Sequence, residues 1–393
     1  MKHFKDIFRT IFLLLTVVVC QTETHAQQKP DEICPDSIEV SLVTCSPHEE
    51  VYSLYGHSAL RWHDLRTGLD AVFNWGMFNF MAPHFVSRFV FGLTDYELGM
   101  GNFRIFCSYY RKWGSSVTEQ VLNLTGEEKL RLYNALIENL RPENKIYRYN
   151  FFYDNCSTRP RDIIERCVGG KILYAERPDY TPTFREMIHQ KVSHHPWAQF
   201  GNDMLLGLRA DLKTTRTEQE FLPENLMHDF DHAQIHADDG SYRPLVSGRR
   251  MAVKPGVQVR ESDFPFTPTE CFMALLVVCT AIMALEIRRK KTFKYWDAAL
   301  MVAEGLAGCV ILVMFFSQHP TTSTNLQLLL LNPLPFLFLW PVLKRRKTRW
   351  WTLQLLLITL FLLGSMLQDY AEGMEILALC LLSRILINYM YAK

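Results

Sequence analysis

A cysteine in this chain stands in a setting that suits nucleophilic chemistry. Cys156 lies in the segment Asn-Phe-Phe-Tyr-Asp-Asn-Cys-Ser-Thr-Arg-Pro-Arg-Asp, residues 150–162, where an aromatic extended stretch meets a predicted helix. Backbone N–H groups at a helix N-terminus are unpaired and partly positive, so they stabilise a thiolate and can bind an oxyanion. A buried structural cysteine or a disulfide partner explains the same segment equally well.

A histidine provides the base that such a thiol needs. His57 follows a glycine turn and enters a strand in the phrase Tyr-Gly-His-Ser-Ala-Leu-Arg. Because its pKa lies near neutrality, an imidazole there can take the thiol proton and later return it. The group that orients the imidazole is expected to be Asn74, on the next strand, with Asp70 and Asp64 as the other candidates.

Three further histidines have the spacing of one helix face. His228, His232 and His236 recur every four residues, with Asp229 and Asp231 between them. Such a row could offer imidazoles to zinc, but one extended row rarely closes a tetrahedral site. A solvated polar face explains the pattern as well, so we expect no metal and no cofactor.

The elements around these residues read as strands first and helices later. Alternation of apolar and polar residues predicts strands at 38–45, 58–62 and 71–80. The Thr125 cap followed by Glu128 predicts a helix over 126–140. Residues 148–153 read as extended, and 161–168 as a helix with Pro160 near its first turn. This order predicts an α+β domain.

The N-terminus has the order of a secretory signal. Positive charges precede an apolar run from Ile11 to Cys20 and a polar stretch that ends at Ala26. We expect cleavage after Ala26, because the apolar run is shorter than the roughly 20 residues that span a bilayer. An uncleaved anchor and a lipid-modified Cys20 are the alternatives.

The last third of the chain is apolar enough for a membrane. The net charge of +1 and the mean hydropathy of −0.03 average a polar part and an apolar part, and they do not suggest nucleic acid as a partner. Five spans are predicted, at 268–287, 298–316, 326–343, 350–368 and 376–391. The linkers after the first and third spans are rich in lysine and arginine and should be cytoplasmic, whereas 317–325 and 368–375 lack both and should face outside.

Two charges fall inside these spans. Glu304 and Arg384 each lie about seven residues, or roughly 10 Å, from the cytoplasmic side. An interhelical ion pair that fixes helix packing is the favoured interpretation, with a proton relay as the alternative.

In the exported part, five cysteines, an odd number, lie between the signal and the first span, so at least one thiol should be free or bonded to another chain.

Several phrases carry a resemblance to a known family. A histidine followed later by an Asn-Cys at a helix start resembles circularly permuted papain-like enzymes of the NlpC or LRAT-like type, the latter being the lecithin retinol acyltransferase group. More closely, Leu-Val-Thr-Cys-Ser-Pro, Val-Tyr-Ser-Leu-Tyr-Gly-His-Ser-Ala-Leu-Arg, Phe-Asn-Trp-Gly-Met-Phe and Phe-Leu-Pro-Glu-Asn-Leu, with the 150–162 segment, resemble the Lnb family of Bacteroidota over nearly the whole mature chain. The resemblance implies a signal at 1–26, a periplasmic thiol acyltransferase domain at 27–240, a juxtamembrane connector at 241–265 and a transmembrane helical domain at 266–393, in the bacterial inner membrane.

The activity that this resemblance implies is lipoprotein N-acylation. A fatty acyl chain would pass from a phospholipid through a Cys156 thioester to the α-amine of a diacylated lipoprotein, with His57 and Cys156 as the family's catalytic pair. The membrane is thus a partner, and substrate contacts are expected from the residues Arg61, Arg159, Arg161, Asn155, His319 and Asn332. The alternatives are a papain-like hydrolase of lipid esters or cell-wall peptides, and a non-catalytic envelope scaffold with a disulfide-bonded Cys156.

Overall fold

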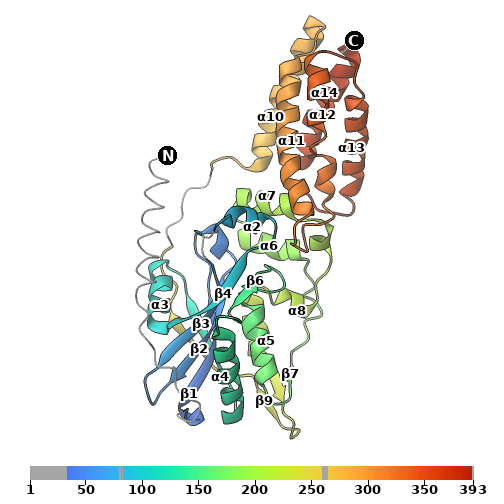
Figure 1. The fold of residues 1–393 in the computed structure, drawn as a ribbon. Helices are drawn as coiled ribbons and strands as arrows, with labels where there is room; N and C mark the ends of the chain where they lie inside the picture. Colours follow the sequence, from blue (N-terminus) through green and yellow to red (C-terminus); the bar gives the residue numbers. More distant parts are fainter. Residues whose placement is uncertain (1–32, 79–80, 82, 259–263, 392–393) are drawn as a thin grey trace.

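The computed structural model describes residues 33–78, 81, 83–258 and 264–391, so the predicted signal lies outside the described part. Its N-terminal domain is built on a seven-stranded antiparallel sheet in the order β10-β5-β1-β2-β3-β4-β6 (Figure 1). The strands are β1 (Ile38–Cys45), β2 (His57–Asp64), β3 (Asp70–Met77), β4 (Asp95–Asn102), β5 (Val117–Leu122), β6 (Ile146–Arg148) and β10 (Val246–Val253). The strand predicted at 38–45 is confirmed with the same bounds.

Helices cover both faces of this sheet. On one face, Leu60 and Trp62 of β2 pack with apolar residues of α4 (Gly126–Leu140), α5 (Thr158–Cys167) and α9 (Pro223–Asp231). On the other face, Ala59 and Val72 pack against α3 (Phe103–Lys112). The capping box of Thr125 and Glu128 begins α4 as predicted. The mixture of a sheet with later helices confirms the α+β prediction for this domain.

The folded exported domain continues past the boundary expected at residue 240. A three-stranded sheet joins β7 (Lys171–Leu173), β8 (Gln234–His236) and β9 (Tyr242–Pro244), and β10 then pairs with β5. The strands β9 and β10 thus lie within residues 241–265, where the sequence predicts a connector. The Gly-Arg-Arg sequence of β10 hides its alternation, because its arginines form ion pairs across the sheet, as Arg250 does with Glu119.

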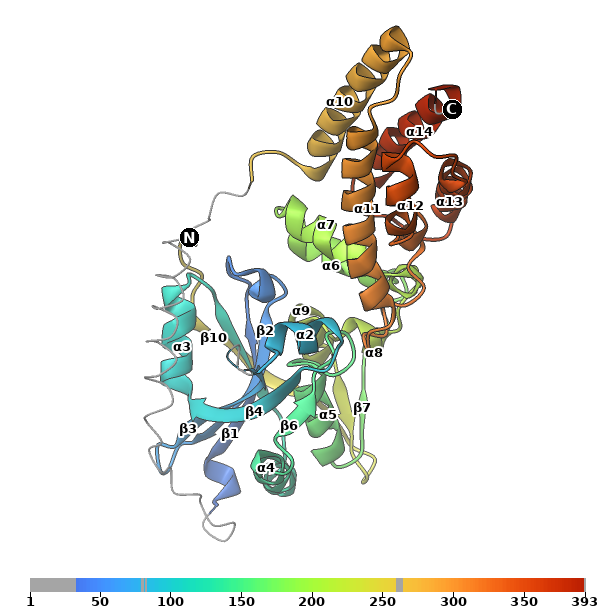
Figure 2. The ribbon, with the colours of Figure 1, turned by 45° about the horizontal axis from the view of Figure 1, so that its top comes forward.

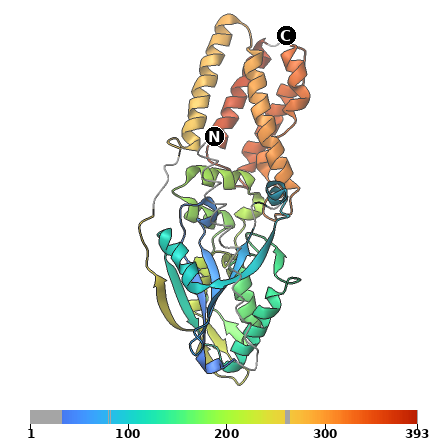
Figure 3. The same cartoon turned by 60° about the vertical axis from the view of Figure 1, so that its left-hand side comes forward.

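Short helices lie between the sheet and the membrane-spanning region. They are α2 (Phe85–Val90), α6 (Phe184–Val192), α7 (Pro196–Leu205) and α8 (Arg216–Gln219). In Figures 1 and 3, α6 and α7 lie at one end of the sheet and separate it from the C-terminal helices. The sheet therefore presents one of its ends to the membrane domain.

The C-terminal region forms helices α10 (Pro268–Arg289), α11 (Lys294–Phe315), α12 (Pro335–Leu343), α13 (Trp350–Gly364) and α14 (Met374–Tyr391). Within the described residues, α10, α11 and α14 are long and apolar enough to cross a membrane, and α13 is a shorter apolar helix. The span predicted at 326–343 is broken: a 3-10 turn at Leu326–Leu329 precedes α12, which has nine residues. Pro333 and Pro335 explain this break, because proline cannot donate to the preceding turn.

The predicted pair between Glu304 and Arg384 is wrong. Arg384 forms a bidentate pair with Glu286 on α10, at 2.7 Å for both contacts, and a third contact of 2.8 Å with Asp297 on α11. Glu304 instead accepts from Gln354 Nε2 at 2.8 Å. Arg384 is almost fully buried, so its two carboxylate partners supply the charge that burial requires.

The two parts of the chain are joined by backbone and amide hydrogen bonds. The side chains of Asn325, Gln327 and Gln368 donate to the carbonyl oxygens of residues 204, 203 and 206, at 2.9, 2.8 and 3.1 Å. Gly207 N donates to Thr321 O at 2.8 Å. These contacts place the 317–325 linker and Gln368 on the same side as the exported domain, as the distribution of basic residues predicted.

Candidate active site

Cys156 and His57 meet at the end of the sheet that faces the membrane helices. β1 ends at Cys45 directly opposite His57, the first residue of β2, and α5 begins two residues after Cys156. Figure 2 shows α6 and α7 above this end of the sheet, with α2 beside it. The thiol and the imidazole are hydrogen-bonded to each other, so elements about a hundred residues apart in sequence converge here.

Asn74 orients the histidine. His57 Nε2 donates to Asn74 Oδ1 at 2.6 Å, from the neighbouring strand β3. Because the amide oxygen can only accept, Nε2 carries a proton, and Nδ1 is the nitrogen left to face the sulfur. The other two candidates lie elsewhere: Asp70 pairs with Arg61, and Asp64 accepts from Ser37 Oγ at 2.8 Å.

The electrostatics favour a thiolate beside an imidazolium. Burial alone would raise the pKa of the Cys156 thiol, but the positive charge and hydrogen bond of His57, the Ser58 backbone N–H and the Ser157 hydroxyl outweigh burial and lower that pKa. Burial would likewise lower the pKa of His57, but the Cys156 charge and the hydrogen bonds to Cys156 and Asn74 raise it. The pair is therefore arranged to ionise together.

Two serines tie the strand to the helix. Ser58 Oγ and Ser157 Oγ lie 3.0 Å apart, and they directly follow His57 and Cys156. Gly76 on β3 has a φ of +91°, and a Cβ there would lie 3.7 Å from the Cys156 Cβ. The hydroxyl contact and this close strand approach hold the sulfur against the end of the sheet.

Asn155 positions the helix rather than facing a substrate. It is buried, its Oδ1 accepts from the Ser157 and Thr158 backbone N–H groups at 2.8 and 3.0 Å, and its Nδ2 donates to two carbonyl oxygens, those of Phe151 and Phe221. All of its amide contacts are internal. The predicted substrate contact thus corresponds to a helix cap next to the nucleophile.

The three arginines differ in their access to solvent. Arg61 pairs with Asp70 and Glu119, and Arg161 pairs with Asp162 and Glu220; their side chains are 11% and 8% exposed. Those ion pairs occupy both guanidinium groups within the protein, so neither is available as a phosphate ligand.

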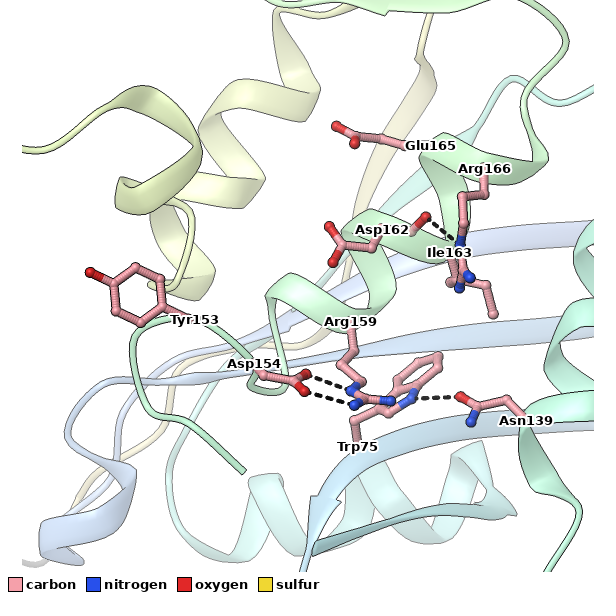
Figure 4. A pocket seen from close by; sticks show the side chains of 9 residues that line it. All are labelled: Trp75, Asn139, Tyr153, Asp154, Arg159, Asp162, Ile163, Glu165 and Arg166. Carbon is pink, nitrogen blue, oxygen red and sulfur yellow. Dashed lines mark hydrogen bonds and ion pairs between the residues drawn. The ribbon is translucent and has the colours of Figure 1, made fainter. Parts of the chain in front are cut away.

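Arg159 is the most accessible of the three, at 26% exposure of its side chain. It pairs through Nε and Nη2 with Asp154 and lies over the Tyr147 ring at 3.8 Å. Figure 4 shows it in a cavity of about 680 Å³, together with Trp75 and carboxylates from α5. Arg159 lies three residues after Cys156, and Trp75, which also lines the cavity, directly follows Asn74.

The two predicted membrane-domain contacts lie at different places. His319 Nε2 donates to Phe89 O of α2 at 2.9 Å, so it joins the membrane loop to the exported domain. Asn332 is buried, and its Oδ1 accepts from Leu334 N at 3.1 Å. Asn332 therefore caps the backbone at Pro333 and Pro335, where we had expected a substrate contact.

His48, Ser58 and Ser157 were missed in the sequence. His48 is buried and stacks on Trp113 at 4.4 Å; burial, with the positive charge of His57, lowers the pKa of His48 to about 4. His48 is thus neutral near the pair. Ser58 and Ser157 directly follow His57 and Cys156, and this adjacency could have identified them from the sequence. No signal in the sequence indicated His48.

All nine cysteines within the described residues are free thiols, Cys156 included. No group of three or more metal-ligating side chains occurs in the same residues. Helix α9 ends at Asp231, before the second and third of the predicted histidines. His228 and His232 stack on each other at 4.4 Å between ring centroids, whereas His236 lies on β8 beside Tyr242. The three histidines do not share a helix face.

The site and the helices together define a membrane-anchored protein with a thiol centre in its exported domain. Residues 26–190 match the family described as the Lnb N-terminal periplasmic domain, and residues 259–393 match the Lnb transmembrane domain. The chain belongs to the Lnb family. It is therefore a multi-pass membrane protein with a periplasmic N-terminal domain, related to lipoprotein biosynthesis. No curated protein and no solved structure matches it, so the permuted papain-like fold stays a prediction.

Proposed function

We propose that this protein is a lipoprotein N-acyltransferase of the inner membrane. It moves a fatty acyl chain from a phospholipid through a Cys156 thioester to the α-amine of a diacylated lipoprotein cysteine. The observation that carries the proposal is the Cys156–His57–Asn74 contact at the membrane-facing end of the exported domain's sheet. A free thiol at Cys156 supports this function over a disulfide-bonded scaffold.

In the first half-reaction, the Cys156 thiolate attacks the carbonyl carbon of the donor ester. The Ser157 and Thr158 N–H groups are already bonded to Asn155, so we assign the oxyanion to the backbone N–H of Cys156, at the start of α5. The tetrahedral intermediate then expels the lysophospholipid alkoxide, which takes the proton from the His57 imidazolium. A thioester and neutral His57 remain.

In the second half-reaction, the neutral amine of the lipoprotein attacks the thioester carbonyl. His57 takes the proton that the amine nitrogen loses, and the Cys156 thiolate leaves as the amide forms. The thiolate and imidazolium are thereby restored. Asn74 keeps Nδ1 of His57 directed at the sulfur through both steps, and Arg159 in its cavity is our candidate for the donor phosphate.

Mass spectrometry tests the reaction. Purified full-length protein in phospholipid vesicles is incubated with a diacylated lipopeptide, and both the peptide and the intact protein are weighed. We expect one acyl mass on the peptide amine and an acyl mass on the protein that hydroxylamine removes. Cys156→Ala should abolish both gains, whereas Cys34→Ala, which removes an exposed thiol, should retain them. Free fatty acid without acylated peptide would instead indicate a hydrolase.

A further inference from the structure

A row of aromatic rings runs along α2 and its flanking segments. The Phe78 ring stacks on Phe85 at 5.8 Å between centroids, Phe85 stacks on Phe89 at 6.3 Å, and Phe89 meets His319 at 6.1 Å. At the other end, Tyr52 contacts Phe78 at 6.4 Å. We call these five residues the aromatic row.

One end of the aromatic row reaches the membrane domain. Besides the His319 bond to Phe89 O, Gln318 N donates to Phe91 O at 2.9 Å. A Cβ at Gly92 would lie 3.1 Å from His319 N, so the two backbones pass close together here. These contacts fall just after α11, where Phe316 is 72% exposed, on the side of the membrane that carries the exported domain.

The other end reaches the thiol site. Phe78 follows Gly76 by two residues, and Gly76 is the point where β3 approaches Cys156. Tyr52 contacts His48 at 6.1 Å, and His48 in turn senses the charge of His57. The row therefore runs from the periplasmic side of the membrane domain to the end of the strand that approaches Cys156.

The surface of the row is apolar and open. Phe89 is 49% and Tyr52 is 60% exposed, while Phe78 and Phe85 are half-buried. The charged side chain of α2, Arg88, bonds to Leu93 O and Asp95, and it takes no part in the ring contacts. Contiguous exposed apolar surface is a feature of lipid and ligand interaction sites, and the ring contacts join the two exposed side chains.

We propose that the aromatic row is the surface along which an acyl chain of the donor phospholipid passes from the outer leaflet to Cys156. This inference rests on the proposed function and assigns its donor path. Drawing an ester out of the bilayer exposes methylene groups to water, and each exposed methylene costs free energy unless apolar surface covers it. The ring contacts offer that cover from His319, just after α11, to Phe78, two residues beyond Gly76 on the strand beside the sulfur. Its continuity with the membrane helices favours a lipid chain over a soluble peptide.

The test separates the donor path from the chemistry. Thioester formation on the full-length protein is timed without lipoprotein, using either phospholipid vesicles or a water-soluble short-chain thioester as donor. Phe89→Ser should slow the vesicle reaction by about tenfold or more, while the soluble donor reacts within about twofold of wild type. Phe89→Leu keeps the apolar surface and should retain the vesicle rate. Leu65→Ser, an exposed apolar residue at a turn away from the row, is the matched control and should retain both rates.

Three results would overturn the donor path. The first is an unchanged vesicle rate in Phe89→Ser. The second is an equal loss with both donors, which would indicate damage to the site or the fold. The third is normal thioester formation with a slow chase into lipopeptide, which would assign the row to the acceptor. Vesicles with a photoreactive acyl chain add a readout independent of catalysis: labelling of α2 without any thioester would support the path and reject the proposed function, whereas no labelling of α2 would reject the path.

Discussion

Removing the Asn74 amide tests whether the hydrogen bond at 2.6 Å to His57 Nε2 supports catalysis. When His57 takes the thiol proton, this bond becomes charge-assisted, and such bonds contribute about 1.5 to 3 kcal/mol. The contact is only partly buried, so we expect the lower part of that range, about 1.5 to 2 kcal/mol. Asn74→Ala should therefore slow thioester formation by about 10- to 30-fold.

Asn74→Asp strengthens the hydrogen bond to His57 that Asn74→Ala removes. A carboxylate keeps an acceptor in place and stabilises the imidazolium more strongly than an amide does. The variant should recover most of the rate lost in Asn74→Ala, and the pKa of His57 should rise further. The rate is measured from the acyl mass on intact protein over a range of pH, with donor vesicles in excess.

The matched control is Asn123→Ala, which removes a side-chain hydrogen bond of 3.1 Å from Asn123 Nδ2 to Pro244 O, just beyond the far end of β5. It should leave the rate unchanged, and thermal unfolding of all three variants should show that they fold. The reasoning is refuted if Asn74→Ala reacts within about twofold of wild type, or if Asn74→Asp is no better than Asn74→Ala.

Other residues give shorter tests. His57 lowers the pKa of the Cys156 thiol below its ordinary 9.0, so alkylation of Cys156 should be faster near neutral pH than that of an ordinary thiol. In His57→Ala, burial is left to raise the thiol pKa, and alkylation should become fast only near pH 9 or above. Arg384→Ala leaves two buried carboxylates without their cation and should destabilise the protein by about 3 to 5 kcal/mol, measured by thermal unfolding in detergent. A Cβ at Gly308 would overlap the backbone of Asn332, so Gly308→Ala should lower the free energy of unfolding by about 1 to 3 kcal/mol in the same assay. Gly201→Ala, with open space around the new Cβ, should leave it unchanged.

Local signals in the sequence identified the elements and residues that depend on nearby neighbours. The helix at 126–140 was predicted because its cap and its apolar face lie within one stretch of chain. The Cys156, His57 and Asn74 assignments rested on residue type and on position at a helix start or in a strand. The structure brings all three together.

Features that depend on distant partners could not be predicted. The partners of Arg384 depend on which helices pack together, and equal depth in the predicted spans pointed to Glu304 instead of Glu286. The strand β10 is recognisable only through its pairing with β5, because its sequence carries arginines where a strand usually alternates. The broken third span was readable in part from Pro333 and Pro335, but its apolar composition favoured a continuous helix.

The joint between the two domains explains how a thiol in the periplasm keeps a fixed height above the bilayer. The last carbonyl groups of a helix have no partner within it. At the end of α7 these carbonyls accept from Gln327 and Asn325, and the next residue accepts from Gln368. Arg185 also donates to the carbonyl oxygens of Asp203 and Leu206, and the membrane loops add their bonds to these. Separating the domains therefore costs the three amide hydrogen bonds of Asn325, Gln327 and Gln368. Because the aromatic row meets the same membrane face through His319, the exported domain is held at two places, and the thiol cannot tilt away from the lipid surface without breaking one of them.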